Sequence, residues 1–446
     1  MKKALTFGIM FMFFTAVFAD GMIVNTFQMP ARQESQEAFI HYENGKENLF
    51  IMVNMQEAVQ SGQKNVWIFP VPSSPENIEI NNLRGFPRLG GEEIKQKTIG
   101  NLLGLEAYMA TAAFPPFIVF SMLMMIGSVG TIGTANYETG SKAVDVSGLT
   151  IYEHIDKYGI ATEVIKAHDS ALFRDFLEAR GTNLSSEAEN FLKEYMGQDY
   201  SFVISWISDA EQAGENNGNY YGQTNPIGVF IKFPSKDIYY PLKPTAYYGN
   251  DSFPVTVNIS GFKNPEIFQN IKEKTKIGHY YRAFLSRTIQ EEETLIQIFN
   301  GTLPQELAYT KISINTSASY FTQDLRISTQ ENYGAHGLNW INQTWLFWML
   351  LLFLGFAYLS IFLTNKLYLN NGLQRKHLII IALSNLATAI AAAIVFAVIS
   401  KKYFGLKPKE DEFSKKFSAL ILFEGLFLAM AILLLIITIS LAMASY

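Results

Sequence analysis

The chain has 446 residues, of which 49% are apolar and 17% are charged, and its formal net charge is −5. A small negative charge without a basic run argues against a nucleic-acid partner. The absence of cysteine excludes disulfides, thiolate nucleophiles and zinc sites with Cys ligands.

The first residues have the layout of a secretory signal peptide. Lys2 and Lys3 precede an apolar run over 4–18, and small residues near position 19 offer a cleavage site. We expect a signal peptide over 1–19, the alternative being an uncleaved N-terminal anchor. In both cases the chain from residue 20 is predicted to be exported, so its N-x-S/T motifs become candidate glycosylation sites. These motifs lie at Asn183, Asn250, Asn258, Asn300, Asn315 and Asn342.

The next segment alternates in the manner of a β-sheet. Two apolar runs flank Asn44-Gly45, a pair that favours a tight hairpin turn because both residues tolerate a positive φ. A third strand is predicted at 66–71, and Pro70 favours an edge position for it.

Residues 107–137 form a long stretch without a charged side chain. Pro115-Pro116 and several glycines weaken a helix here. Three interpretations stay open: an apolar hairpin lying on a membrane or buried under the domain, a single membrane crossing, or a mobile loop.

The pattern from 150 onward predicts short helices mixed with strands. A hairpin is expected around Lys157-Tyr158-Gly159, followed by a helix capped by Asp169. Ser186 and Glu189 have the spacing of a capping box for a second helix. Further strands are predicted at 201–208, 227–233, 237–242 and 255–260, Asn264-Pro265 is expected to start a helix to Lys276, and residues 329–343 are read as a polar stalk.

Three long apolar segments close the chain, at 344–364, 378–400 and 417–443. A helix needs about 20 apolar residues to cross a bilayer core about 30 Å thick. The sequence therefore predicts a multi-pass cell-membrane protein with three transmembrane helices over 344–446. An extracytoplasmic α+β domain, mainly of antiparallel sheet with short helices, is predicted over 20–343.

The distribution of positive charge argues against an orientation in which the domain over 20–343 lies outside the cell. Residues 401–416 carry six lysines, although positive charge normally marks the cytoplasmic side. A crossing at 107–137 would reconcile charge and signal peptide, but it would divide the exported domain. Glu424 is the one ionisable residue of the third apolar segment, which makes it a candidate functional carboxylate, with an interfacial glutamate as the alternative.

Several strings resemble a family of secreted prokaryotic proteins known only as a domain of unknown function. The similar strings are the W-x-x-P-V-P motif of WIFPVPSSPENIEI (67–80), IDKYGIATEVIKAHDSALFRDFLEARG (155–181), the F-P-S…Y-P-L motif of VFIKFPSKDIYYPLKP (229–244), and PQELAYTKISINTSASYFTQDLRI (304–327). The resemblance implies one continuous exported domain over about 20–328 and carries over no functional residue.

Recognisable catalytic motifs are missing from the sequence. None of the six histidines belongs to an H-E-x-x-H or H-x-H arrangement, and there is no nucleophile elbow, phosphate loop or dinucleotide fingerprint. The loop over 209–219 is rich in oxygen ligands, but Ala213 and Tyr220 occupy positions where an EF-hand needs ligands, so a solvated loop is favoured. We predict no catalytic, cofactor-binding or metal-binding residue and no cofactor.

Four tyrosine doublets are candidates for contacts to proteins or sugars, because adjacent strand residues face opposite sides. They are Tyr220-Tyr221, Tyr239-Tyr240, Tyr247-Tyr248 and Tyr280-Tyr281.

Together these features predict a membrane-anchored binding or envelope-organising protein. Its expected partners are the lipid bilayer and other envelope or membrane proteins. One alternative is a hydrolase in which a histidine, an acid and a serine converge without a sequence motif. Another is a subunit of a membrane transport or assembly complex that uses Glu424.

Overall fold

In the computed structural model, the chain divides into two compact units. The first comprises Met1–Gly91 and Asn136–Asn332, and the second comprises Glu92–Ala135 and Tyr333–Tyr446. The structure describes residues 22–25, 36–53, 65–101, 150–180, 182, 184–214, 227–282, 288–345 and 374–384, with single helical positions between 345 and 402. The predicted signal peptide, the apolar stretch at 107–137 and the third apolar segment lie outside these residues.

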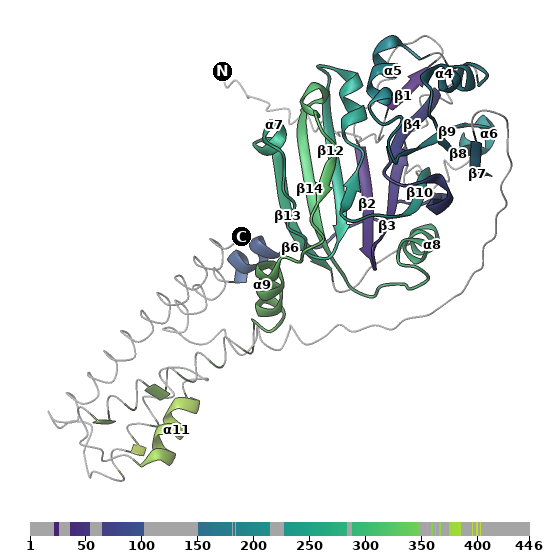
Figure 1. Cartoon of the computed structure of the whole chain (residues 1–446). Coiled ribbons are helices and arrows are strands. Elements are labelled where there is room, and N and C mark those ends of the chain that lie inside the picture. Colours follow the sequence, from purple (N-terminus) through teal and green to yellow (C-terminus); the bar gives the residue numbers. More distant parts are fainter. Residues whose placement is uncertain are drawn as a thin grey trace, which may run out of the picture. The chain divides into compact units, whose positions relative to one another are not determined.

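The first unit is built on two sheets (Figure 1). The smaller sheet has the strand order β1-β4-β9-β8-β7, and all its neighbouring strands are antiparallel. Its strands are β1 (Met22–Asn25), β4 (Asn65–Val71), β7 (Thr150–Lys157), β8 (Ile160–Lys166) and β9 (Ser201–Ile207).

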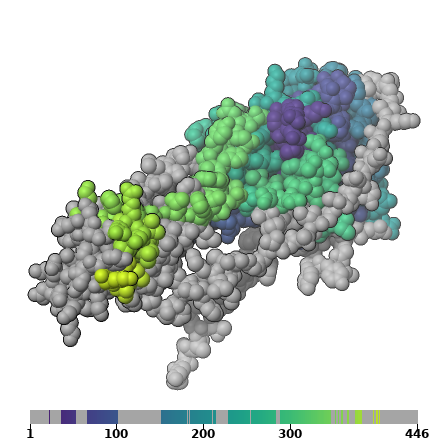
Figure 2. Space-filling view, turned by 90° about the horizontal axis from the view of Figure 1, so that it is seen from below, coloured from purple at the N-terminus to yellow at the C-terminus, as the bar shows by residue number. Residues whose placement is uncertain are grey.

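Within the first unit, the larger sheet runs in the order β5-β10-β3-β2-β12-β14-β13. Strands β2 and β12 are parallel, so this sheet is mixed. In Figure 2, residues from the start of the chain, in purple, lie beside teal and green residues from its middle. The strands are β2 (Gln36–Glu43), β3 (Lys46–Val53), β5 (Glu79–Arg84), β10 (Ile227–Pro234), β12 (Ser252–Ser260), β13 (Thr275–Arg282) and β14 (Leu307–Ser317).

The two sheets pack face to face and are covered by helices on their outer sides. Trp67 and Phe69 of β4 point into the core between the sheets, whereas the alternate residues Val66 and Ile68 point to the outer side. There they meet helices α4 (Ser170–Glu178) and α5 (Ser186–Lys193). Helix α8 (Ile289–Ile298) covers the outer face of the larger sheet with Ile298. Because both faces of the central strands are buried, their sequences are apolar runs.

Shorter elements connect these layers. They are η1 (Pro75–Asn77), α6 (Ala210–Gly214), β11 (Ile238–Tyr240), η2 (Lys243–Tyr248), α7 (Gln269–Lys272), η3 (Ala318–Tyr320) and β15 (Leu325–Ile327). The α+β class and the short helices predicted from the sequence are confirmed.

Both predicted hairpin turns are confirmed. Asn44 and Gly45 have φ values of 53° and 75°, and Tyr158 and Gly159 have 63° and 75°. A tight turn between twisted antiparallel strands needs two such residues in succession. Asp169 also caps α4 as predicted, since its side chain accepts a hydrogen bond from the backbone N–H of Ala171 at 2.6 Å.

Three local predictions are wrong. The cap of α5 is Ser185, which accepts from the N–H of Ala188, and not Ser186. Asn264-Pro265 does not start a helix to Lys276, because α7 covers only Gln269–Lys272 and β13 starts at Thr275. Strand β4 lies between β1 and β9 and is no edge strand, although Pro70 lies beyond the residues that pair with β1.

The second unit contains β6 (Glu92–Glu93), helical residues 94–101, α9 (Tyr333–Gln343) and α11 (Arg375–Ser384). The predicted polar stalk at 329–343 is largely helix α9. Its buried residues are Ala335, Leu338 and Asn342, which recur at the spacing of one helix face.

The prediction of a three-helix transmembrane region is corrected by the structure. Among the described residues, no helix is both long enough and apolar enough to cross a membrane. Helix α11 overlaps the start of the second apolar segment. The transmembrane helices and the multi-pass membrane localisation are therefore not supported.

Candidate functional site

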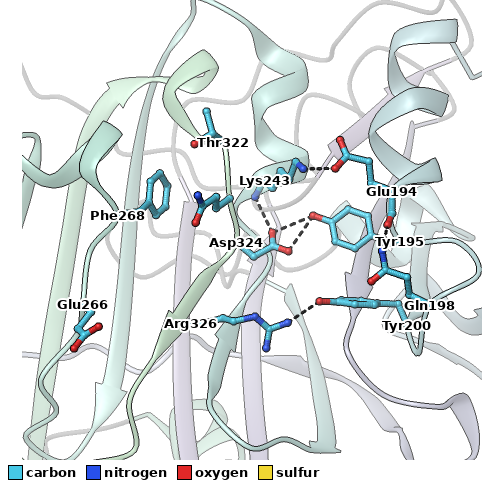
Figure 3. A pocket seen from close by; sticks show the side chains of 11 residues that line it. Glu194, Tyr195, Gln198, Tyr200, Lys243, Glu266, Phe268, Thr322, Asp324 and Arg326 are labelled. Carbon is cyan, nitrogen blue, oxygen red and sulfur yellow. Dashed lines mark hydrogen bonds and ion pairs between the residues drawn. The ribbon is translucent and has the colours of Figure 1, made fainter.

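A polar pocket of about 340 Å³ opens on the first unit where five segments converge (Figure 3). They are the end of α5, the residues before β9, the start of η2, the residues before α7, and the segment leading into β15. Its lining residues are Glu194, Tyr195, Gln198, Tyr200, Lys243, Glu266, Phe268, Thr322, Gln323, Asp324 and Arg326.

The floor of the pocket rests on a small ribbon. Strands β11 and β15 are antiparallel, with Tyr239 opposite Arg326. The ribbon is pinned to the main core by buried Ile238, Leu325 and Ile327. Asp324 lies directly before β15, so its side chain is held by a rigid element.

Asp324 is the centre of the hydrogen-bond network in the pocket. The Tyr195 hydroxyl donates to both carboxylate oxygens, at 3.2 and 3.0 Å. The Tyr239 hydroxyl donates to Oδ2 at 3.1 Å, and the backbone N–H of Lys243 donates to Oδ1 at 2.9 Å. Burial raises the pKa of Asp324, while these donors and the charge of Arg326 oppose that rise.

Tyr195 and Tyr200 line one side of the pocket, and the buried ring of Tyr239 packs behind them. Tyr195 packs edge-on against Tyr200 at 5.1 Å between ring centroids, and Tyr200 packs edge-on against Tyr239 at 6.3 Å. Nη2 of Arg326 donates to the Tyr200 hydroxyl at 2.7 Å. Burial raises the pKa of the Tyr195 and Tyr239 hydroxyls, so both remain protonated donors at neutral pH.

An ion pair and an amide lie on the same side of the pocket as Tyr195 and Tyr200 (Figure 3). Nζ of Lys243 donates to Oε2 of Glu194, and Nε2 of Gln198 donates to the carbonyl of Glu194 at 2.6 Å. Figure 3 shows Phe268 and Glu266 across the pocket from Tyr195 and Tyr200. The site therefore presents fixed donors and acceptors together with aromatic surface.

A second carboxyl group lies on the other side of β11. The backbone N–H of Tyr239 donates to Oε2 of Glu47 at 2.7 Å. Glu47 has no exposed surface, and within the described part of the chain its Oε1 has no hydrogen-bond partner. Burial raises the pKa of Glu47 well above its usual value, against the N–H of Tyr239 and the charge of Arg326.

A histidine, a serine and a glutamate meet on the neighbouring strands β2 and β12. Nδ1 of His41 lies 2.7 Å from Oγ of Ser260, and its Nε2 lies 3.8 Å from Oε2 of Glu43. Burial lowers the pKa of His41, while the charge of Glu43 opposes that decrease. The imidazole is thus kept neutral, the state in which it accepts a proton.

The predicted candidate residues do not gather at either place. Asn250, Asn300 and Asn315 are exposed, whereas Asn183 and Glu424 lie outside the described residues. Their roles stay predictions.

Two other predicted glycosylation sites are buried. The amide nitrogen of Asn258 donates to Glu37 and Ala38, and that of Asn342 donates to Ile94 and Thr98.

The tyrosine doublets are only in part as expected. Tyr239 and Tyr240 are both fully buried, because β11 has protein on each side, so the expected outward ring is missing there. Tyr247 is partly exposed and Tyr248 is buried, in line with the expectation. Among the doublet members that the structure describes, Tyr239 is the one that bonds to Asp324.

Sequence reasoning missed Asp324 and Tyr195. Tyr195 lies 129 residues from Asp324, and no local spacing signals such a pair. Asp324 lies near the end of the string over 304–327 that carries the family resemblance, whereas Tyr195 lies outside all four strings. Comparison of the chain with protein-family models, curated proteins and solved structures finds no match. The resemblance to secreted prokaryotic domains stays a prediction.

Proposed function

We propose that this protein is a binding module and that the pocket around Asp324 holds a small polar ligand. The observation that supports this proposal is the fixed network at Asp324. Two tyrosine hydroxyls and one backbone N–H hold its carboxylate before any ligand arrives. Preorganised polar groups reduce the entropic cost of binding, and pockets of this size hold small molecules.

The lining chemistry favours binding over catalysis. Among the described residues, the lining of the pocket contains no histidine and no serine, which are common catalytic bases and nucleophiles. The tyrosine hydroxyls that face Asp324 are donors with raised pKa values, so neither is activated as a nucleophile or base. Such groups orient a ligand rather than react with it.

A ligand screen on the intact chain tests this proposal. Small polar compounds are added at millimolar concentration and binding is followed by NMR and by the shift in melting temperature. Arg326→Gln and Glu266→Gln change two exposed lining residues, whereas Glu211→Gln changes an exposed residue outside the pocket. We expect ligands whose binding is weakened by the first two changes only. Binding unaffected by both, or no binding at all, would contradict the proposal.

A hydrolase is the second candidate function, and the contact between Ser260 and His41 favours it. In such a reaction Oγ of Ser260 attacks an ester carbonyl while Nδ1 of His41 takes the hydroxyl proton and passes it to the leaving alkoxide. Water then releases the acyl group. Glu43 lies beyond hydrogen-bond distance of His41, so the third member of a triad is less well placed.

A fluorophosphonate probe distinguishes the two candidates. If the hydrolase hypothesis is correct, the probe labels the wild-type protein, and Ser260→Ala abolishes labelling. Ser313→Ala on the neighbouring strand β14 is the control. Absence of labelling in the wild-type protein would remove this candidate and leave the binding module unaffected.

A further inference from the structure

The pocket around Asp324 has two walls of different character. Phe268 and Glu266 come from the segment before α7, and Tyr195 and Tyr200 come from the end of α5 and the segment after it (Figure 3). A ligand between these walls meets an aromatic ring on either side and polar groups below.

The basic side chains of the lining already have partners. Lys243 is paired with Glu194, and Arg326 donates to Tyr200 while its charge acts on Asp324. An ionic ligand would have to displace these partners, so its new ion pairs would only replace existing interactions. The net gain in binding free energy would be small. Neutral ligands face no such competition.

Spare hydrogen-bonding capacity remains at the charged groups. A guanidinium has five N–H donors, and the bond to Tyr200 uses one of them. Glu266 is exposed and lines the opposite wall, where its carboxylate accepts several bonds. A ligand with neighbouring hydroxyl groups both donates to Glu266 and accepts from Arg326.

Phe268 adds an apolar surface to this polar site. Its ring is partly exposed and packs against the core from the pocket side. A ring molecule with one C–H face and a rim of hydroxyls satisfies this surface and the polar groups at once. Sugar rings have this combination, whereas amines and carboxylates do not.

We propose that the pocket around Asp324 binds a carbohydrate, with one sugar ring against Phe268 and its hydroxyls bonded to Glu266 and Arg326. This inference rests on the proposed binding function and names its ligand class. A free sugar and the end of a longer glycan share the same recognition chemistry.

The test uses the full chain and two kinds of probe. Free hexoses, N-acetylhexosamines and hexuronates are titrated first by saturation-transfer NMR, and an array of oligosaccharides then separates free sugars from glycan ends. Polar compounds without a sugar ring, namely amino acids, short peptides and amines, form a parallel arm.

Substitutions at Phe268 assign the contact. Phe268→Leu removes the ring but keeps apolar volume, and we expect about tenfold weaker sugar binding, equal to about 1.4 kcal/mol. Phe268→Trp keeps an aromatic face and is expected to retain binding. Tyr320→Leu changes an exposed aromatic residue outside the pocket and serves as the matched control.

The outcomes separate the inference from the function on which it rests. Sugar binding that is lost in Phe268→Leu and kept in Phe268→Trp and Tyr320→Leu supports both. If amino acids, peptides or amines bind at the pocket and sugars do not, the proposed carbohydrate ligand is wrong. The proposed binding function is then still supported. Sugar binding that is insensitive to Phe268→Leu overturns the proposed contact. No binding in either arm overturns both proposals.

Discussion

The backbone N–H of Tyr239 donates to Oε2 of Glu47 at 2.7 Å, and this bond ties a fully buried carboxyl group to strand β11. On the same residue the hydroxyl donates to Asp324. Tyr239 therefore links the buried acid of the core to the pocket. A change in the ionisation of Glu47 therefore alters a hydrogen bond of strand β11, the strand that contains Tyr239.

Glu47 is expected to make the stability of the first unit depend on pH. Burial raises its folded pKa above the ordinary value of 4.5, so the folded state binds the proton more tightly than the unfolded state. The free energy of unfolding is then highest below pH 4.5 and falls as the pH rises toward the folded pKa. Urea denaturation at a series of pH values measures this slope.

Glu47→Gln should remove the contribution of Glu47 to the pH dependence of the unfolding free energy. Glutamine keeps an oxygen for the N–H of Tyr239 and cannot ionise. At a pH above the folded pKa we expect the variant to be more stable than the wild-type protein by about 1–3 kcal/mol. Glu178→Gln, which changes an exposed residue of α4, is the control and should keep the wild-type slope. An unchanged slope in Glu47→Gln would show that another group titrates.

Tyr195→Phe removes one of the donors to Asp324. Its hydroxyl lies 3.0 Å from Oδ2, and a hydrogen bond to a charged group contributes about 1.5–3 kcal/mol. We expect a loss of about 2 kcal/mol in unfolding free energy and a further rise in the pKa of Asp324, because that hydrogen bond lowers it. NMR titration of the carboxyl carbon measures the pKa. Tyr200→Phe, whose hydroxyl accepts from Arg326, leaves the bonds to Asp324 in place and should not raise that pKa.

Ser185 and Ser186 distinguish the observed helix start from the one that the sequence spacing indicates. Ser185 accepts from the N–H of Ala188 at 3.1 Å, so Ser185→Ala should cost about 1 kcal/mol by loss of the N-cap. Ser186→Ala lies inside α5 and should change the unfolding free energy by less than about 0.5 kcal/mol. Equal effects in urea denaturation would place the cap elsewhere. Because α5 leads into Glu194 and Tyr195, the cap also fixes one side of the pocket.

Local sequence signals predicted the hairpins well. Asn44-Gly45 and Tyr158-Gly159 specify their turns through backbone preferences that act within four residues. Helix α9 was predicted to be a stalk because the segment 329–343 is polar and contains glycine. Its buried face has only two apolar residues, Ala335 and Leu338, together with Asn342. The apolar segments at the end of the chain were predicted to be membrane spans from hydropathy alone, and no helix among the described residues is long and apolar enough to cross a membrane.

The site was beyond the reach of such signals. Asp324 receives hydrogen bonds from Tyr195, Tyr239 and Lys243, at sequence separations of 129, 85 and 81 residues. Only the packing of β11 and β15 under the end of α5 brings these groups together. Tyrosine doublets drew attention to Tyr239, but the expected reason, an exposed ring, was not the one that the structure gives.

Gly159 and Gly45 occupy equivalent hairpin turns and should nevertheless differ in their response to substitution. Both have φ of +75°, so replacement by alanine brings a similar backbone strain of about 1 kcal/mol. An added Cβ at Gly45 meets no atom within 4 Å, whereas at Gly159 it would lie 2.3 Å from the carbonyl oxygen of Asp209 and 2.7 Å from the nitrogen of Ala213. One atom belongs to the residue before α6 and the other lies within α6. Both are backbone atoms, which cannot rotate away as a side chain would.

We therefore expect Gly45→Ala to lower the free energy of unfolding by about 1 kcal/mol and Gly159→Ala by about 2–4 kcal/mol, because overpacking adds to the strain. Urea denaturation of the two variants, measured side by side, gives the difference directly. Proteolysis near α6 gives an independent readout, since relief of the clash requires that Asp209 and Ala213 move. Equal losses in the two variants would mean that α6 does not pack against this turn in solution.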